Sequence, residues 1–169
     1  MNRKTAIFCA LCVANCVAWA ASTTAAERFG RYHNDRFAFS VDIPADWRAD
    51  PPPENGDGLS FRQPSGQGLI SAFARLAQGS FAIEARDAFA ERDLEAITFK
   101  RAGKDWVAVS GLRLGAIYYR RGVLGCGGEV WSEVDIEYPE AEKANYDALV
   151  THVAASLRPG IGKNAAHCR

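Results

Sequence analysis

Histidine and methionine are scarce in this chain of 169 residues, which has three histidines and one methionine. His33, His152 and His167 lie far apart, and no HExxH motif occurs, so the usual pattern of a zinc hydrolase is absent. The chain also lacks the G-x-G-x-x-G and G-x-x-x-x-G-K-[ST] loops that cradle phosphates, and the G-x-S-x-G elbow of serine hydrolases. We therefore expect no cofactor, no metal and no catalytic residues.

Long apolar runs are missing except at the N-terminus. There, two basic residues precede an apolar run over residues 6–20, followed by small residues, which is the pattern of a secretory signal peptide. We predict a signal peptide over residues 1–26, with cleavage after residue 20 or 25 as alternatives. An uncleaved anchor would need a run of about 20 apolar residues, and a lipoprotein would need a cysteine at the end of the run, whereas Cys16 lies inside it. The mature chain is expected in the periplasm or secreted, without a membrane span.

An excess of charge of either sign is also missing. The leader takes Arg3 and Lys4 from the 20 basic residues and nothing from the 20 acidic ones, so the mature formal charge is near −2. This balance gives no electrostatic reason to bind nucleic acid or anionic membrane. The remaining length fits a single domain over residues 27–160, followed by a polar tail over residues 161–169. The sequence does not indicate an oligomeric state.

Only two of the five cysteines, Cys126 and Cys168, follow the predicted leader. In an oxidising compartment such a pair can form a disulfide. The bond would tie the tail to the domain and contribute about 2 to 4 kcal/mol. The alternative is a buried Cys126 and a free Cys168 on a disordered end. We predict the disulfide.

Strand patterns dominate the mature sequence. Apolar residues alternate with polar or small ones from Phe37 to Ile43, which predicts a half-buried strand. The run "DPPPENGDG" then predicts a long turn, because prolines and Asn-Gly and Asp-Gly pairs favour turn conformations. Strands are predicted over Leu59–Arg62 and Leu69–Arg75. Four further runs, residues 95–103, 104–113, 115–124 and 129–138, are rich in β-branched and aromatic residues and favour an antiparallel meander.

Two segments change to helical periodicity. The first follows Ser80, a suitable N-cap, and the second runs from Pro139 to Arg158. The apolar stripe of the second helix consists of Tyr146, Leu149, Val150, Val153 and Leu157. Strands with helices before and after the meander predict an α+β domain in which helices pack on an antiparallel sheet.

Several segments resemble a family of uncharacterised exported bacterial proteins with a Mog1/PsbP-like fold. They are "RYHNDRFAFSVDIPADW", "ENGDGLSFRQPSG", "ITFKRAGKDWVAVSG", "IYYRRGVL" and "YPEAEKANYDALVTHVAASLRPG". The resemblance covers nearly all of the mature chain and implies an α-β-α sandwich around an antiparallel sheet. It also implies a noncatalytic binding or accessory role, and it offers no catalytic residues to carry over.

Four residues are candidates for contact with a partner in the cell envelope: Trp47, Asn55, Asp57 and Trp131. The "NGDG" loop is interpreted as a structural turn, with a calcium site as the alternative, since its oxygen ligands do not follow EF-hand spacing. The tryptophans could equally belong to the core. The partner itself is unknown.

Two other functions stay open at this stage. A small envelope hydrolase would need a pocket that joins Ser110 or Cys126 to His152, and a small-ligand carrier would need a deep apolar cavity. Glu133 and Asp135 alternate with apolar residues, and we expect them to face water or basic neighbours such as Lys100, Arg113 or Arg120, rather than to act as a catalytic pair.

Overall fold

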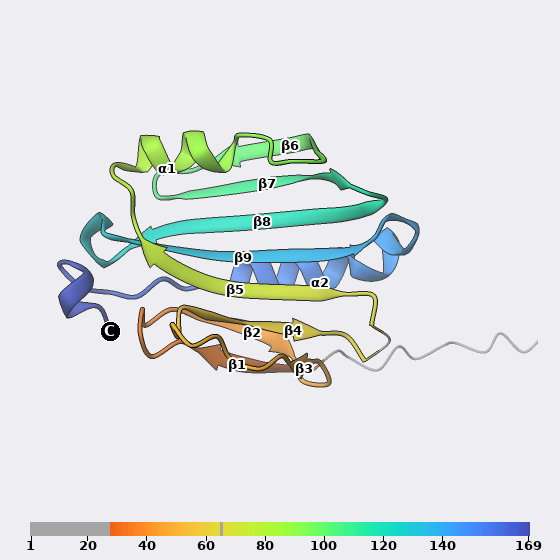
Figure 1. Cartoon of the computed structure of the whole chain (residues 1–169), viewed down its shortest axis with the longest axis horizontal. Helices are drawn as coiled ribbons and strands as arrows, with labels where there is room; N and C mark the ends of the chain where they lie inside the picture. Colours follow the sequence, from red (N-terminus) through yellow and green to blue (C-terminus); the bar gives the residue numbers. More distant parts are fainter. Residues whose placement is uncertain (1–27, 65) are drawn as a thin grey trace, which may run out of the picture.

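The computed structural model describes residues 28–64 and 66–169 (Figure 1). The predicted signal peptide therefore lies outside the described residues. Within the described ranges, no helix combines the length and hydropathy needed to cross a membrane.

A seven-stranded antiparallel sheet forms the centre of the fold, with strand order β3-β4-β5-β9-β8-β7-β6. Its strands are β3 (Arg48–Ala49), β4 (Gly58–Arg62), β5 (Leu69–Leu76), β6 (Glu95–Ala102), β7 (Trp106–Arg113), β8 (Ala116–Gly125) and β9 (Val130–Pro139). A separate hairpin consists of β1 (Phe29–His33) and β2 (Ser40–Pro44). The two helices are α1 (Phe81–Ala88) and α2 (Lys143–Ser156). The predicted α+β class and the meander of β6 to β9 are confirmed.

The hydrophobic core lies between one face of the sheet, helix α2 and strand β2. Figure 1 shows α2 behind β5 and β9, and β6 and β7 extend beyond it. The predicted apolar stripe of α2, Tyr146 to Leu157, is buried against this face. Side chains alternate across a strand, so Ile70, Ala72 and Ala74 of β5 meet the same core while the residues between them face the other way.

Helix α1 packs on the opposite face of the sheet. The carboxylate of Glu84 in α1 is fully buried and accepts a hydrogen bond from Arg75 at 2.6 Å, and Arg75 points away from the core because it follows Ala74. Ser80 is the N-cap of α1, as predicted, although its side chain makes no capping hydrogen bond. The two helices on opposite faces give the expected α-β-α arrangement.

The sequence did not reveal two of the strands. No strand is predicted before Phe37, but residues Phe29–His33 form β1, which pairs with β2 in register from Phe29↔Pro44 to His33↔Ser40. Strand β3 has only two residues. Within residues 28–64, three strands therefore precede the "NGDG" loop, where one was predicted.

The tail over residues 161–169 folds back on the domain. The predicted disulfide between Cys126 and Cys168 is present, with a Cα–Cα distance of 5.3 Å. The backbones of Ile161 and Arg169 also pair through two hydrogen bonds of 2.9 and 3.0 Å. The alternative of a free, disordered end is not what the structure shows.

Candidate functional site

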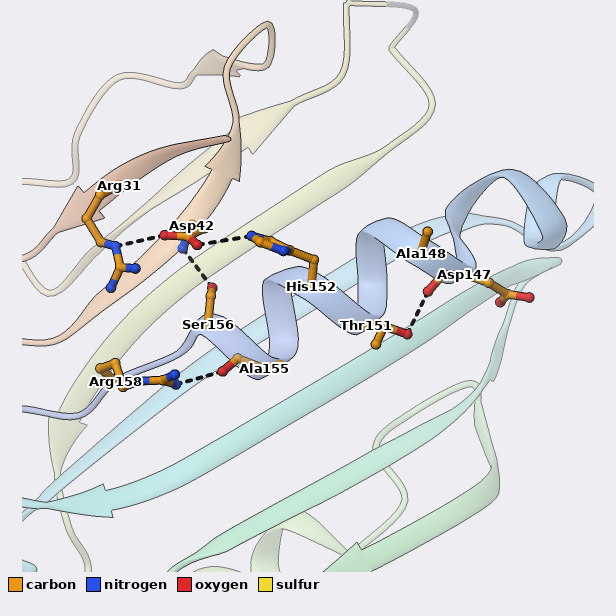
Figure 2. Close-up of a pocket in the computed structure, with 9 residues that line it drawn as sticks. All are labelled: Arg31, Asp42, Asp147, Ala148, Thr151, His152, Ala155, Ser156 and Arg158. Carbon is orange, nitrogen blue, oxygen red and sulfur yellow. Dashed lines mark hydrogen bonds and ion pairs between the residues drawn. The ribbon is translucent and has the colours of Figure 1, made fainter. Parts of the chain in front are cut away.

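A charged groove lies between helix α2 and the β1–β2 hairpin, and we call it the α2 groove (Figure 2). Its volume is about 750 Å³, and it is open to solvent. It is lined by Arg31 of β1, Asp42 of β2, the α2 residues Asp147, Ala148, Thr151, His152, Ala155 and Ser156, and Arg158. The groove exists because β2 turns its apolar residues inward and leaves Asp42 beside the polar side of α2.

Asp42 organises the α2 groove. Its carboxylate contacts the Nε of Arg31 at 2.7 Å and the Nε2 of His152 at 3.0 Å, and its backbone N–H donates to the hydroxyl of Ser156 at 2.8 Å. The imidazole of His152 also stacks on Phe29, with ring centroids 3.9 Å apart. These contacts fix the histidine at the junction of the helix and the hairpin.

Asp42, His152 and Ser156 are not arranged as a catalytic triad. In a triad the histidine lies between the acid and the hydroxyl. Here the hydroxyl of Ser156 accepts from the backbone of Asp42 and donates to the carbonyl of Val153 at 2.7 Å. The structure shows no hydrogen bond between His152 and Ser156 in the described ranges. The arrangement therefore positions exposed charges, but it does not activate a nucleophile.

The residues required by the hydrolase alternative lie in different places. Ser110 of β7 donates to the carbonyl of Tyr118 at 2.8 Å and lines a separate groove of about 570 Å³. Cys126 is committed to the disulfide. His152 lies in the α2 groove. Ser110 and His152 thus line different grooves, and Cys126 lines neither of them, which weakens this alternative.

The "NGDG" loop braces the β1–β2 hairpin. Within the loop, the Asn55 amide donates to the carboxylate of Asp57 at 2.7 Å. Across to the hairpin turn, Asn34 donates to the carbonyl of Gly56 at 3.0 Å, and Arg36 donates to the carbonyl of Asn55. Gly56 has φ +62°, a conformation that favours glycine. No cluster of three or more His, Cys, Asp or Glu side chains suited to a metal occurs in the described part of the chain.

The two candidate tryptophans are buried. Trp47 is 8% exposed, and its ring lies against Gly68, which also contacts the hydroxyl of Tyr146. Trp131 is 1% exposed, packs beneath Gly122 and donates from its indole N–H to Glu133 at 2.9 Å. The structure therefore does not bring the four candidate residues together on one surface. Asn55 and Asp57 lie on the exposed loop, whereas the two indole side chains are buried inside the fold.

A network of charged residues occupies the α1 face of the sheet. Arg120, 3% exposed, donates to Glu95 at 2.5 Å and lies 4.0 Å from Asp135. Arg113 contacts Glu95 at 3.5 Å and pairs with Glu137. Arg92 lies 3.6 Å from Glu133. The expectation that the β9 carboxylates meet Arg113 and Arg120 is confirmed, whereas Lys100 lies over the ring of Phe89 instead, 5.8 Å from its centroid.

This network strongly affects one carboxyl group. The pKa of Asp135 is raised from 3.8 to about 7, chiefly by burial and then by the nearby Glu133 carboxylate, while Arg120, Arg113 and Arg92 oppose the rise. Four carboxylates, those of Glu95, Glu133, Asp135 and Glu137, share the network with three arginines.

The α2 groove has almost no signal in the sequence. No sequence pattern marks Arg31, Asp42 alternates with apolar residues on a predicted strand, and Arg158 ends a predicted helix. Asp42 and His152 meet although they are 110 positions apart. A long-range pair of this kind has no periodic signature.

Comparison of the sequence with known protein families and with curated proteins finds no match. Comparison with solved structures does. The cyanobacterial PsbP protein (CyanoP) of Synechocystis sp. PCC 6803 is 12% identical with a TM-score of 0.60, and the match covers 85% of this chain and 98% of that one. LpqN of Mycobacterium tuberculosis, described as involved in cell envelope biogenesis, is 14% identical with a TM-score of 0.50, covering 80% and 93%. The expected resemblance is confirmed at the level of the fold, which is PsbP-like.

Proposed function

We propose that this chain is an exported, noncatalytic accessory protein that binds another protein of the cell envelope through the α2 groove. The predicted leader and the disulfide support an oxidising compartment outside the cytoplasm. The fold is one that proteins with accessory roles use, although a fold alone does not determine function.

The single observation that carries the proposal is the pair of contacts that the Asp42 carboxylate makes with Arg31 and His152. It holds Arg31 and His152 in fixed positions while both stay about half exposed, at 53% and 46%. The hydroxyl of Ser156, beside them, is engaged in hydrogen bonds with the backbone of Asp42 and Val153. Preorganised, exposed charges in an open groove suit recognition of a partner surface, because little side-chain freedom is lost on binding.

Asn55 and Asp57 enter the proposal as supporting residues. They hold the turn of the hairpin whose strands carry Arg31 and Asp42. Trp47 contributes from beneath, because it belongs to the same buried core as Val41 and Ile43 of β2, whereas Trp131 lies on the other face of the sheet, beside Gly122 and Glu133. We therefore expect changes in the loop to weaken binding less than changes in the groove.

Affinity capture from envelope extract tests the proposal. The bait is the mature chain, compared with an Arg31→Ala/His152→Ala variant and with a matched Arg48→Ala/His33→Ala control that alters exposed residues outside the groove. Circular dichroism first establishes that all three fold. We expect a partner that the wild type and the control retain and the groove variant loses.

Two results would contradict the proposal. One is a wild-type bait that enriches no protein in repeated captures. The other is a groove variant that retains every partner of the wild type, which would move the contact elsewhere on the molecule.

A further inference from the structure

The two edges of the sheet differ in length. One edge is β3, which has two residues, and the other is β6, which has eight, Glu95–Ala102. In the described part of the chain, no strand pairs with the outer side of β6. A long unpaired edge presents a row of backbone N–H and C=O groups to which another extended chain can add.

Grooves flank this edge on both faces of the sheet. On the α2 face, the groove of about 570 Å³ is lined by residues that include Thr98, Phe99, Leu112 and Tyr119. On the α1 face, a depression of about 280 Å³ is lined by Phe89, Glu91, Ile97, Thr98, Phe99 and Lys100. Successive side chains of a strand point to opposite faces. A strand added to β6 would therefore place alternate side chains into the two depressions.

The groove on the α2 face is apolar where it meets the edge. Phe99 is 47% exposed, and Leu112 and Tyr119 are partly exposed beside it. They remain accessible because α2 covers β5 and β9 and leaves β6 and β7 beyond it (Figure 1). Apolar side chains of an added strand would be buried here.

The C-terminal half of the edge is basic. Lys100, Arg101 and Lys104 are all exposed. None of them takes part in an ion pair with another described residue. Arg121 adds to this charge, because the register Arg101↔Ala108↔Arg121 places both arginines on one face. Charge complementarity therefore favours an acidic partner.

The N-terminal end of β6 is not free to pair with an added strand. The backbone N–H of Ile97 donates to the carboxylate of Glu91 at 3.2 Å, and the register with β7 shifts between Ile97 and Phe99. Both features restrict the open edge to residues 98–102.

We propose that residues 98–102 of β6 accept an extended, acidic segment of a partner protein as an added strand. The apolar side chains of that segment enter the groove beside Phe99 on the α2 face, and its carboxylates, on the opposite face, meet Lys100, while Arg101 and Arg121 add positive charge beside the groove. The inference rests on the proposed function, that the chain binds an envelope protein, and it adds the second surface and the chemistry of the segment bound there. Basic residues on an edge also discourage self-pairing, and that role alone predicts no binding of an acidic strand.

Titration with a labelled peptide tests this surface directly. The probe is a fluorescein-labelled ten-residue peptide of alternating glutamate and valine, which presents valines on one face and carboxylates on the other. The controls are the same peptide with lysine in place of glutamate, and the glutamate peptide with N-methyl groups at alternate residues, which keeps its charge but blocks strand pairing. We expect anisotropy to rise only with the unmodified acidic peptide, and hydrogen exchange to slow at residues 98–102.

The matched variants reverse charge at the two edges. Lys100→Glu/Arg101→Glu changes β6, and Arg28→Glu/Arg48→Glu makes the same change in net charge near the β3 end. We expect the first to weaken peptide binding at least about tenfold, and the second to leave it unchanged. The absence of binding, equal binding of the N-methylated peptide, or equal binding by the β6 variant would overturn the inference.

Envelope capture separates this inference from the proposed function. A partner that is lost with the α2-groove variant but kept by Lys100→Glu/Arg101→Glu overturns the β6 assignment and leaves the proposed function standing. A partner that is lost with both variants supports both. No partner for the wild type overturns the proposed function and, with it, the biological role of the β6 edge.

Discussion

The two faces of the central sheet are built on different physical principles. The α2 face is apolar, and Ile70, Val134 and Ile136 are fully buried there. The α1 face also buries apolar side chains, such as Tyr118 and Trp131, but it places the buried Arg120–Glu95 pair among them, with Glu133 and Asp135 beside it. Burial of apolar area is insensitive to pH, whereas a buried charge is tolerated only while its partners are in place. The contribution of the α2 face to the free energy of unfolding should therefore be the same at every pH. The contribution of the α1 face should depend on pH and on the presence of each charged partner.

Loss of one partner in the charged network should have the largest effect. Arg120→Met removes the cation that meets Glu95 at 2.5 Å and lies 4.0 Å from Asp135. Because carboxylates are then left buried without their main partner, we expect the free energy of unfolding to fall by about 3 to 5 kcal/mol. Urea denaturation at pH 7 measures this change. A matched Arg120→Met/Glu95→Met variant should recover much of the loss, and a double variant as unstable as the single one would contradict the explanation.

A cavity in the apolar face should cost slightly less. Ile136→Ala removes a fully buried side chain next to α2, and we expect the free energy of unfolding to fall by about 2 to 5 kcal/mol. The comparison predicts that this loss is the same at pH 5 and pH 8. Ile161→Ala, at a position that is 79% exposed, is the control. A loss for Ile136→Ala that changed with pH would break the distinction between the faces.

Asp135 should make the charged face pH-dependent. Its pKa is about 7 in the folded chain against an ordinary value of 3.8, so between these values the folded chain holds a proton that the unfolded chain has released. Stability should therefore decline as pH rises from about 4 to about 7. Asp135→Asn removes this group, and we expect the variant to be more stable than wild type by about 1 to 3 kcal/mol at pH 8 and equal to it at pH 4.

Denaturation at pH 4, 6 and 8 measures that difference. Asp93→Asn, at an exposed position, serves as the control and should follow the wild type at each pH. An advantage of Asp135→Asn that is equally large at pH 4 and pH 8 would show that the carboxylate matters through packing and not through its proton.

The smallest predicted effect lies outside both faces, in the turn between β7 and β8. Leu114 and Gly115 have φ +51° and +82°, and Leu114 is 81% exposed. A two-residue turn with positive φ at both positions favours Asn-Gly. We expect Leu114→Asn to raise the free energy of unfolding by about 0.5 to 1 kcal/mol at every pH, measured in the same urea series. A loss of stability would show that the exposed leucine makes a contact that burial does not reveal.

The sequence predicted best the elements whose signal is local. The alternation around Val41 and the stripe from Tyr146 to Leu157 each follow from burial on one side, and both match the structure. Strand β1 was missed because it is largely exposed and contains Gly30, and β3 because two residues show no periodicity. These two strands form because their backbones pair with β2 and β4, and their sequences show no alternation of apolar and polar residues.

The candidate site was predictable only where register could be anticipated. Arg113 and Arg120 were named as partners of the β9 carboxylates, and they are: Arg120 lies on β8, which pairs with β9, and Arg113 reaches Glu137 from the end of β7, across β8. The sequence could not show that Lys100, unlike these two arginines, does not contact the β9 carboxylates. Its position over Phe89 depends on the irregular register of β6. The Asp42–His152 contact depends on how a helix crosses a hairpin, which no local pattern encodes.

Because of the Cys126–Cys168 disulfide, the covalent structure of the protein depends on the compartment in which the protein is produced. Its formation removes two hydrogen atoms, so oxidised and reduced chains differ by about 2 Da, and thiol-disulfide equilibria differ between the cytoplasm and oxidising compartments. Protein produced in a reducing cytoplasm and protein recovered after export can thus share one sequence and still be two chemical species. An intact mass of each preparation tells which of the two is being studied.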